Sequence, residues 1–408
     1  MKGRIVILGG GIGGLVAALR LKRRLAGDVE VILVERRRTQ PFAPAFIPLF
    51  LGKREPGRIA TDLSAAERKG IRVVYDEVSS VAPEERLVIA SRERIPYDYL
   101  IVALGAETDS GAVPGLSAAH EFYSLEGAVK LQEALAGFQG QTVGIVIPRL
   151  PFKCPAAPYE AALLIEEKLR LRRPRSHQVH LQVLTAEKLP MGTAGPVVGR
   201  ALVDLLSSRG IVFRPELPLQ EMTGEGVLVF PGGQTEKFDL VIAVPPHMGP
   251  RALAGSGLAG AGGWVTVDPH TLQSSMDRIY VIGDSASVPL PGRHNPDVPL
   301  ALPKAGVFAH SQAEAVADNL AELLQGRTPS RSFNGKGSCF LETGRGLAAY
   351  GAGDFFATPA PQVSLLPPRR RYRWGKEIFE RSWTAFTRGS MAAEKVWRLG
   401  ERILGLAD

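Results

Sequence analysis

Two residues suited to redox chemistry stand out, because Cys154 and Cys339 are the only cysteines among 408 residues. A cysteine thiolate is a nucleophile, and two thiols can form a disulfide. Two cysteines cannot complete a zinc site alone, a structural disulfide framework needs more of them, and the seven histidines show no metal-ligand spacing. We expect no metal. Taken alone, the pair is either redox-active or two unrelated thiols.

A glycine-rich turn near the N-terminus has the spacing of a dinucleotide-binding site. Gly9, Gly11 and Gly14 form the pattern G-x-G-x-x-G between an apolar run, 4–8, and a helical stretch, 15–25. The first glycine allows a tight turn, the second a close approach to a pyrophosphate, and the third close packing of helix on strand. The helix N-terminus then faces the phosphates.

The next apolar run, 29–34, ends before an acidic residue, as such a site requires. The carboxylate of Glu35 would accept hydrogen bonds from the ribose hydroxyls of an adenosine. Glu35 and its neighbour Arg36 are therefore candidate cofactor-binding residues. With both strands, the helix and the acid in order, the sequence predicts dinucleotide binding.

Two later segments favour FAD over NAD as the dinucleotide. The stretch 97–106 indicates a buried strand that ends in a small-residue turn containing Gly105. The stretch 279–284 indicates a strand that ends in Gly283 and Asp284 and opens toward a helix. The aspartate suits a hydroxyl of the flavin's ribitol chain. Both segments resemble FAD motifs of the flavoproteins with two dinucleotide-binding domains, related to the disulfide reductases.

The chain between these motifs predicts a second domain of the same kind. We expect a strand at 142–147, a helix at 159–170 and a strand at 180–184, and the segment 238–243 echoes the run that begins at Tyr97. Such a domain should have a glycine turn after its first strand.

The expected second glycine turn is missing. Residues 148–158 contain no glycine and four prolines, and they include Cys154. Proline lacks the backbone N–H and fixes φ, so this turn cannot wrap a pyrophosphate. The sequence therefore predicts a lost NAD site with a cysteine in its place.

These elements predict an α/β fold with two Rossmann-like dinucleotide-binding domains, the second inserted into the first, and a C-terminal amphipathic helical tail. We place the discontinuous FAD-binding domain at 1–112 and 246–330. The inserted domain takes 113–245, and the C-terminal region with Cys339 takes 331–408.

Four segments carry a resemblance that runs over nearly the whole chain. The segment 153–160 resembles the active-cysteine segment of sulfide:quinone oxidoreductases and of the flavoprotein subunit of flavocytochrome c sulfide dehydrogenase. The segment 302–309 is similar to a flavin-contacting segment that these families share with type II NADH dehydrogenases. The segment 337–344 resembles the one holding their second redox cysteine, and 371–380 is similar to the start of their C-terminal tail.

The resemblance implies that Cys154 and Cys339 are a redox pair on one face of the flavin. HS⁻ would open a bridge between them, leave a persulfide on one sulfur, and let the released thiolate pass electrons to FAD. Lys153 would favour the thiolate of Cys154, and Glu160 would relay protons; a glutamate that complements a helix dipole is the alternative for Glu160. Many members have a third cysteine, which this chain lacks, so FAD should be bound non-covalently.

The same resemblance implies further contacts to the cofactor and the acceptor. Lys304 would place a cation near the N1–C2=O edge of the flavin, and Pro44 would lie in a loop against the ring. Phe340, Tyr350 and Phe355 are candidates for a quinone channel, or ordinary core residues.

The composition and the tail predict a peripheral membrane protein. The chain is 45% hydrophobic and 22% charged, which excludes general disorder, and no apolar stretch is long enough to span a bilayer. No secretory signal is evident, so we expect the cytoplasmic side. The net charge of +8 suits an anionic membrane or cofactor, and no nucleic-acid fold signature appears.

The tail after Pro368 combines arginines with apolar side chains, as in a helix that lies in the headgroup plane. The alternative is a helix pair packed on the protein or in a homo-oligomer interface. Its apolar positions are Ile378, Phe379, Trp383, Phe386, Val396, Trp397, Ile403 and Leu404.

The predicted function is oxidation of sulfide to sulfane sulfur or polysulfide, with electrons passed from FAD to a membrane quinone. Three alternatives stay open. The first is a sulfide dehydrogenase that passes electrons to a cytochrome. The second is a type II NADH:quinone oxidoreductase, opposed by the proline-filled turn. The third is a non-enzymatic FAD-binding scaffold.

Overall fold

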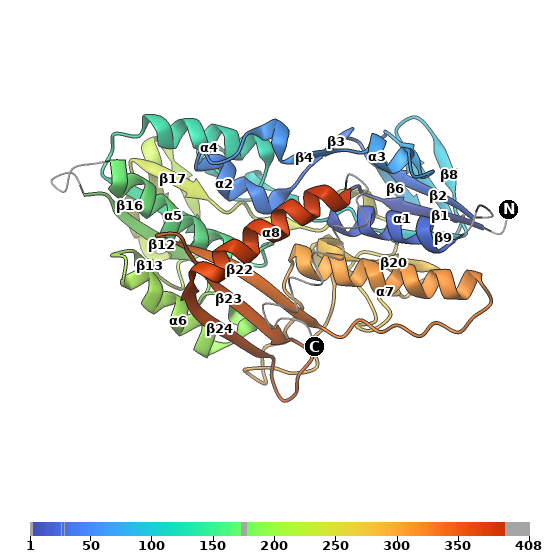
Figure 1. Ribbon diagram of the computed structural model, residues 1–408. Coiled ribbons are helices and arrows are strands. Elements are labelled where there is room, and N and C mark those ends of the chain that lie inside the picture. The colour runs from blue at the N-terminus through green and yellow to red at the C-terminus, as the bar shows by residue number, and fades with distance from the viewer. Residues whose placement is uncertain (1–2, 26, 28, 173–177, 388–408) are drawn as a thin grey trace.

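A parallel five-stranded sheet lies at the centre of the half of the molecule that contains the N-terminus, which is called the first half below (Figure 1). The computed structural model describes residues 3–25, 27, 29–172 and 178–387. The strand order is β20-β9-β1-β2-β5. Strand β20 comes from much later in the sequence than the other four strands, so the chain leaves this sheet after β9 and returns to it at β20. The strands are β1 (Gly3–Leu8), β2 (Val29–Val34), β5 (Arg72–Val74), β9 (Tyr99–Val102) and β20 (Ile279–Val281).

Two helices follow the glycine turn and the last strand of this sheet. Helix α1 (Ile12–Arg24) starts three residues earlier than its apolar pattern predicts, and it packs against α7 (Gly306–Leu324). Buried apolar side chains dominate the contact, and Arg20 Nε donates to Asp318 Oδ1 at 2.7 Å across it. The expected helix directly after Asp284 is wrong. A short 3₁₀ turn and β21 (Ala286–Ser287) follow instead.

A second parallel sheet has the order β13-β12-β11-β17. Its first strand, β11, has the predicted bounds and is almost continuously apolar and buried, as expected for a strand covered on both faces of the sheet. The mixed α/β fold with parallel sheets is therefore confirmed. The elements of this half are α4 (Leu125–Gly137), β11 (Thr142–Ile147), α5 (Ala157–Arg172), β12 (His180–Thr185), α6 (Pro196–Ser207), β13 (Val212–Arg214) and β17 (Leu240–Ala243).

Smaller elements connect and flank the two sheets. The two chain segments that pass between the sheets pair with each other as β10 (Glu107–Thr108) and β18 (His247–Met248). The remaining short elements are β3 (Thr39–Pro41), α2 (Phe46–Phe50), β4 (Ala60–Asp62), α3 (Ser64–Glu67), β6 (Val78–Ala82), β7 (Leu87–Ala90), β8 (Arg94–Pro96), β14 (Glu221–Thr223), β15 (Val227–Val229), β16 (Thr235–Lys237) and β19 (Val265–Thr266).

The C-terminal part is an antiparallel sheet followed by a helix. Strands β22 (Lys336–Gly344), β23 (Leu347–Asp354) and β24 (Gln362–Arg369) lead into α8 (Arg370–Thr387). Strand β22 packs on α5, and α8 packs on β23. Figure 1 shows α8, in red, crossing from this sheet toward the first half of the molecule.

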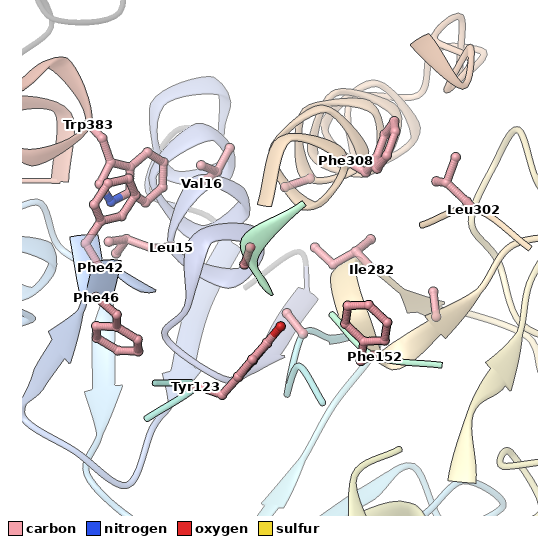
Figure 2. Close-up of a cluster of buried hydrophobic side chains, with 14 of the residues drawn as sticks. Leu15, Val16, Phe42, Phe46, Tyr123, Phe152, Ile282, Leu302, Phe308 and Trp383 are labelled. Atoms are coloured by element: carbon pink, nitrogen blue, oxygen red, sulfur yellow. The ribbon is translucent and has the colours of Figure 1, made fainter. Parts of the chain in front are cut away.

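One face of α8 packs against the protein, as in the alternative of a helix packed on the protein. Trp383 stacks on Phe42 with ring centroids 5.6 Å apart, and Phe379 and Phe386 lie beside this pair. Figure 2 shows Phe42 and Trp383 together in the core near Leu15. The predicted tail positions Val396, Trp397, Ile403 and Leu404 lie outside the described residues. Among the helices that the structure describes, none is long and apolar enough to cross a bilayer.

Candidate active site

The first glycine turn has the close contacts that its spacing predicts. Gly9 has a φ of +95°, and a Cβ there would lie 2.4 Å from the carbonyl oxygen of Ala103. A Cβ on Gly14 would lie 1.9 Å from the carbonyl oxygen of Gly9. Gly11 is different, because a Cβ there would meet nothing within 4 Å. The turn is thus tight toward the protein and open at Gly11, which is what a bound pyrophosphate needs.

Glu35 lies at the end of β2, beside this turn. Its carboxylate is buried and accepts hydrogen bonds from the backbone N–H groups of Gly10, at 2.7 Å, and of Arg37, at 3.0 Å. The neighbouring Arg36 lies on the surface and pairs with Glu77 at 3.0 Å. The structure therefore brings Glu35 to the glycine turn and directs Arg36 to a neighbouring carboxylate.

Asp284 presents an unsatisfied carboxylate oxygen at the end of β20. Within the described part of the chain, its buried Oδ1 has no hydrogen-bond partner. Burial raises the pKa of Asp284, and the charges of Lys153 and Lys304 oppose the rise. Gly105 lies beside it, since its carbonyl oxygen accepts a hydrogen bond from Ser285 Oγ at 2.9 Å. A buried acceptor without a donor suits a ligand hydroxyl.

Lys304 connects this end of the first sheet with the second turn. Its Nζ donates to the backbone carbonyls of Asp284, at 3.0 Å, and of Ala286, at 2.9 Å, and lies 3.7 Å from the ring centroid of Trp264. Burial lowers the pKa of Lys304 to about 8, although Asp284 opposes the shift. The carbonyl oxygen of Lys304 accepts a hydrogen bond from the backbone N–H of Cys154 at 2.6 Å.

Cys154 occupies the place where a second glycine turn would stand. It has a left-handed φ of +53°, which non-glycine residues rarely adopt, and its carbonyl caps the start of α5 by accepting from Ala157 N at 2.9 Å. Its free thiol is exposed. The hydrogen bond to Lys304 and the helix start therefore hold this residue in a conformation that costs on the order of 1–2 kcal/mol.

Cys339 lies on β22, the strand that packs on α5, and its free thiol is also exposed. Although the residue keeps accessible surface, desolvation by the surrounding protein raises the pKa of Cys339 to about 11, and the negative charge of Glu160 adds to the rise. The pKa of Cys154 is raised in the same way. Desolvation is the largest cause, and the charges of Cys339 and Glu160 add to the rise. The two thiols are thus near enough to interact electrostatically. Both keep accessible surface, so a small anion can reach them.

The structure places the side chain of Lys153 against an aromatic ring, and a different lysine acts on both thiols. The Lys153 ammonium lies 6.0 Å from the ring centroid of Tyr123. The cation that lowers the pKa values of Cys154 and Cys339 is Lys376, on α8. Adjacent positions at this turn point in different directions, which the sequence spacing did not reveal.

Lys376 is the site residue that sequence reasoning missed. It donates to Glu160 Oε1 and lies 3.5 Å from Glu342 Oε1. Burial disfavours its charge, yet the two carboxylates raise the pKa of Lys376 above the ordinary value. Burial raises the pKa of Glu160, and Lys376 opposes the shift. The sequence did place Lys376 in the tail segment 371–380, but its partner Glu160 is 216 residues away in the sequence, so no local pattern connects the two.

The remaining predicted residues form two separate groups. Phe340 packs on Tyr350 with ring centroids 5.1 Å apart, and Tyr350 stacks on Tyr372 of α8 at 5.6 Å. Phe355 instead packs on Phe308 of α7 at 5.2 Å. The structure thus joins Phe340 and Tyr350 and places Phe355 in a different aromatic contact.

Pro44 lies in the loop before α2. It is exposed in a short 3₁₀ turn between the buried residues Phe42 and Ala45. Its ring is therefore available to a ligand, as a loop against the flavin requires.

The glycine turn thus follows the first strand of one parallel sheet, and the cysteine turn follows the first strand of the other. A family model described as pyridine nucleotide-disulphide oxidoreductase matches residues 3–146. A second, described as the central part of the sulfide dehydrogenase (flavocytochrome c) flavoprotein chain, matches residues 129–188, which include Cys154.

Relatives of known name match most of the chain. The mitochondrial sulfide:quinone oxidoreductase of Mus musculus is 25% identical over 374 residues, which are 87% of this chain and 79% of the relative. The sulfide-quinone reductase of Aquifex aeolicus is 26% identical over 383 residues, which are 91% and 86%. The chain is therefore a homologue of the sulfide:quinone oxidoreductases.

A solved structure shows the same fold. The X-ray structure of the sulfide:quinone oxidoreductase from the hyperthermophilic bacterium Aquifex aeolicus has a TM-score of 0.85 at 23% identity, and the match covers 99% of this chain and 96% of that one. Proteins of this class are FAD-dependent oxidoreductases. The open backbone at Gly11 and the unpartnered oxygen of Asp284 fit FAD.

Proposed function

We propose that this protein oxidises sulfide to sulfane sulfur and passes the electrons through FAD to a quinone. The observation that carries the proposal is the accessible thiol of Cys154 at the second turn, where proline replaces the glycines of a nucleotide site, together with the accessible thiol of Cys339 on the strand that packs on α5. Cys154 is tied through Lys304 to Asp284, which has the oxygen that fits FAD. The thiols and the cofactor end of the first sheet are thus parts of one site.

The chemistry on the protein's own residues is thiol–disulfide exchange. With Cys154 and Cys339 bridged, HS⁻ attacks one sulfur, which becomes a persulfide while the S–S bond breaks and the other sulfur leaves as a thiolate. Lys376 stabilises that thiolate, because its charge lowers the pKa of both thiols. FAD, when bound, takes up the two electrons and delivers them to the quinone. The sum is HS⁻ + H⁺ + quinone → S⁰ + quinol.

Glu160 is the group that accepts the proton of the incoming sulfur. It is buried, and its negative charge acts on both thiols, so it lies near the place where the proton is released. Its raised pKa makes it a better proton acceptor than an ordinary glutamate. The resemblance adds Lys304 and Pro44 as contacts to a non-covalent flavin, and Phe340 and Tyr350 as contacts to the quinone.

Peripheral membrane binding would bring the quinone to this site. Four of the five exposed side chains of α8 follow one another at helical spacing and form a single stripe: Arg371, Trp374, Ile378 and Arg381. Tryptophan and isoleucine between arginines suit the headgroup region of an anionic bilayer. This stripe, rather than the face containing Trp383, supports the proposed membrane contact.

Cosedimentation with vesicles of phosphatidylcholine and an anionic phospholipid tests the membrane contact. We expect the double variant Trp374→Ser and Ile378→Ser to shift from the vesicle pellet to the supernatant. Val197→Ser on α6 removes an equally exposed apolar side chain outside the stripe and should bind like the wild type. Equal binding of all three proteins would remove α8 as the membrane contact.

Anaerobic turnover tests the function itself. With sulfide and a short-chain quinone, the protein should form quinol and cyanide-reactive sulfane sulfur in equal amounts. Because one matching family model describes a flavocytochrome c flavoprotein chain, cytochrome c is the second acceptor to offer. Sulfide-dependent reduction of cytochrome c without quinone reduction would favour that second function. Reduction of neither acceptor would contradict the proposal.

A further inference from the structure

A chain of charged side chains leads from the redox cysteines toward the surface. Glu160 contacts Lys376, Lys376 lies 3.5 Å from Glu342, and Arg373 Nε holds the other oxygen of Glu342 at 3.0 Å. Arg373 in turn pairs with Glu377 at 2.6 Å. The exposed fraction of the side chains rises from 5% at Glu160 and 9% at Glu342 to 35% at Glu377, so the chain runs from the interior outward.

A small cavity lies at the outer end of this chain, between the 48–54 segment and α8. Its lining includes Lys376 and Glu342 as well as the exposed Lys53, so it joins the two inner groups to the surface. Four cations and three carboxylates line it, and three apolar side chains complete its wall. The charged groups of its lining supply the hydrogen-bond partners that a bound water needs.

The proposed reaction needs a proton exit at this place. Each HS⁻ that becomes sulfane sulfur leaves one proton at the sulfur site, and Glu160 is the carboxylate beside the thiols. Glu160 is buried, and Lys376 donates a hydrogen bond to its carboxylate, so its proton leaves by way of that ammonium group. The nearly balanced charge of the lining gives no net attraction for polysulfide anions, which favours protons as the species that pass.

Resting on the proposed function, we propose that the cavity between the 48–54 segment and α8 is the proton port of the sulfur site and that Glu342 relays protons between Lys376 and the cavity. The transfer is balanced. Lys376 gives one of its protons to Glu342 as it receives one from Glu160, so a single proton moves outward and the ammonium charge is restored. Arg373 is a positioning residue, because it orients Glu342 and does not itself lose a proton.

Substitution of Glu342 tests the relay. Glu342→Gln keeps the shape and removes the proton-carrying carboxylate, and Glu342→Ala also leaves room for a small acid. We expect both to bind FAD and to lower anaerobic sulfide:quinone turnover by about 100-fold, the smaller end of what positioned proton transfer contributes. Formate should restore turnover in Glu342→Ala in a saturable way and leave the wild type unchanged, because it carries protons through the vacated space.

Glu380→Gln is the matched control. Glu380 also lines the cavity, but its partner is Arg54, at 2.7 Å, rather than Lys376, so its turnover should stay within about twofold of the wild type. Wild-type turnover in both Glu342 variants, or a loss that formate does not restore, would overturn the relay even with FAD bound. A wild type that fails to turn over sulfide would overturn the proposed function and this inference with it.

Discussion

The two turns at the ends of β1 and β11 differ in what their backbone offers. Both follow the first strand of a parallel sheet and both precede a helix, α1 or α5. The first turn has glycines where a Cβ would strike the backbone, and it is open at Gly11. The second has four prolines and a cysteine.

The same architecture can therefore hold a nucleotide or a nucleophile, and the choice lies in a few turn residues. Glycine admits a pyrophosphate to backbone N–H groups, whereas proline removes such donors. The left-handed Cys154, anchored by Lys304, presents a thiol instead. We expect the first turn to decide cofactor binding and the second to decide which electron donor reacts.

The largest effect should come from the first turn. Gly14→Ala places a Cβ 1.9 Å from the carbonyl oxygen of Gly9, so the turn cannot close and FAD should be lost along with all activity. The absorbance at 450 nm relative to 280 nm of the purified protein measures this. Gly137→Ala, whose Cβ meets nothing within 4 Å, should keep its FAD. A yellow Gly14→Ala protein would break the comparison.

The next effect should come from the second turn and its partner strand. Cys154→Ser and Cys339→Ser should each keep FAD and lose sulfide-dependent quinone reduction by at least about 100-fold, because one sulfur cannot form the bridge that HS⁻ opens. The double variant should be little worse than either single one, since residues that act as a unit fail together. Additive losses would show that the two cysteines do not act as a unit. FAD loss in either variant would show that the second turn also contributes to cofactor binding.

A smaller effect should follow from removing the cation beside the thiols. Lys376 lowers the pKa of Cys339, so Lys376→Met should raise that pKa, reduce the thiolate fraction and slow alkylation of Cys339 by iodoacetamide by about tenfold per pKa unit. Measured at pH 8 in the Cys154→Ser background, the rate reports on Cys339 alone. Lys376→Arg keeps the charge and should react like the parent. Unchanged alkylation in Lys376→Met would remove Lys376 from the site.

The smallest effect concerns stability at acid pH. Burial lowers the pKa of His247 to about 3, with Lys153 adding to the shift, and the ring packs edge-on against Tyr123 at 5.1 Å. Below the unfolded pKa of about 6.5 the unfolded chain binds the proton that the folded chain refuses, so stability falls as the pH drops from 6.5 toward 3.

Removal of His247 should reduce this acid sensitivity. Between pH 6.5 and 4.5 its contribution reaches about 2–3 kcal/mol, since each pH unit corresponds to about 1.4 kcal/mol. His247→Phe should flatten the fall of the urea midpoint over this range relative to the wild type. His294→Phe is the control, because His294 lies at the surface and its Nε2 donates to the backbone carbonyl oxygen of Thr193, and it should keep the wild-type slope. Parallel slopes in all three proteins would contradict the lowered pKa.

Local sequence patterns predicted the sheets and the first turn well, because each depends on neighbours in the chain. The alternation of apolar runs and glycines predicted β1, β2 and β11 with bounds correct to within one residue. The absence of glycine after β11 predicted the different second turn. The helix expected after Asp284 does not form there, because the segment 283–285 is a 3₁₀ turn, and the next helix, α7, begins only at Gly306.

The charges around the thiols could not be predicted from the sequence. Lys153 is adjacent to Cys154 but points to Tyr123, while Lys376 reaches the site from α8 through Glu160. Such contacts depend on how α8 lies across the molecule, and that is fixed by packing of Trp383 on Phe42. No local pattern contains this information.

The most direct test of the account is anaerobic reduction of the flavin by each candidate donor in turn. The absorbance near 450 nm is followed after sulfide or NADH is mixed with the FAD-loaded protein in the absence of quinone. Because the second turn carries the thiol of Cys154 and lacks the glycines of a pyrophosphate cradle, sulfide should bleach the flavin rapidly and saturably, and NADH should not. Rapid, saturable bleaching by NADH with no response to sulfide would contradict the account.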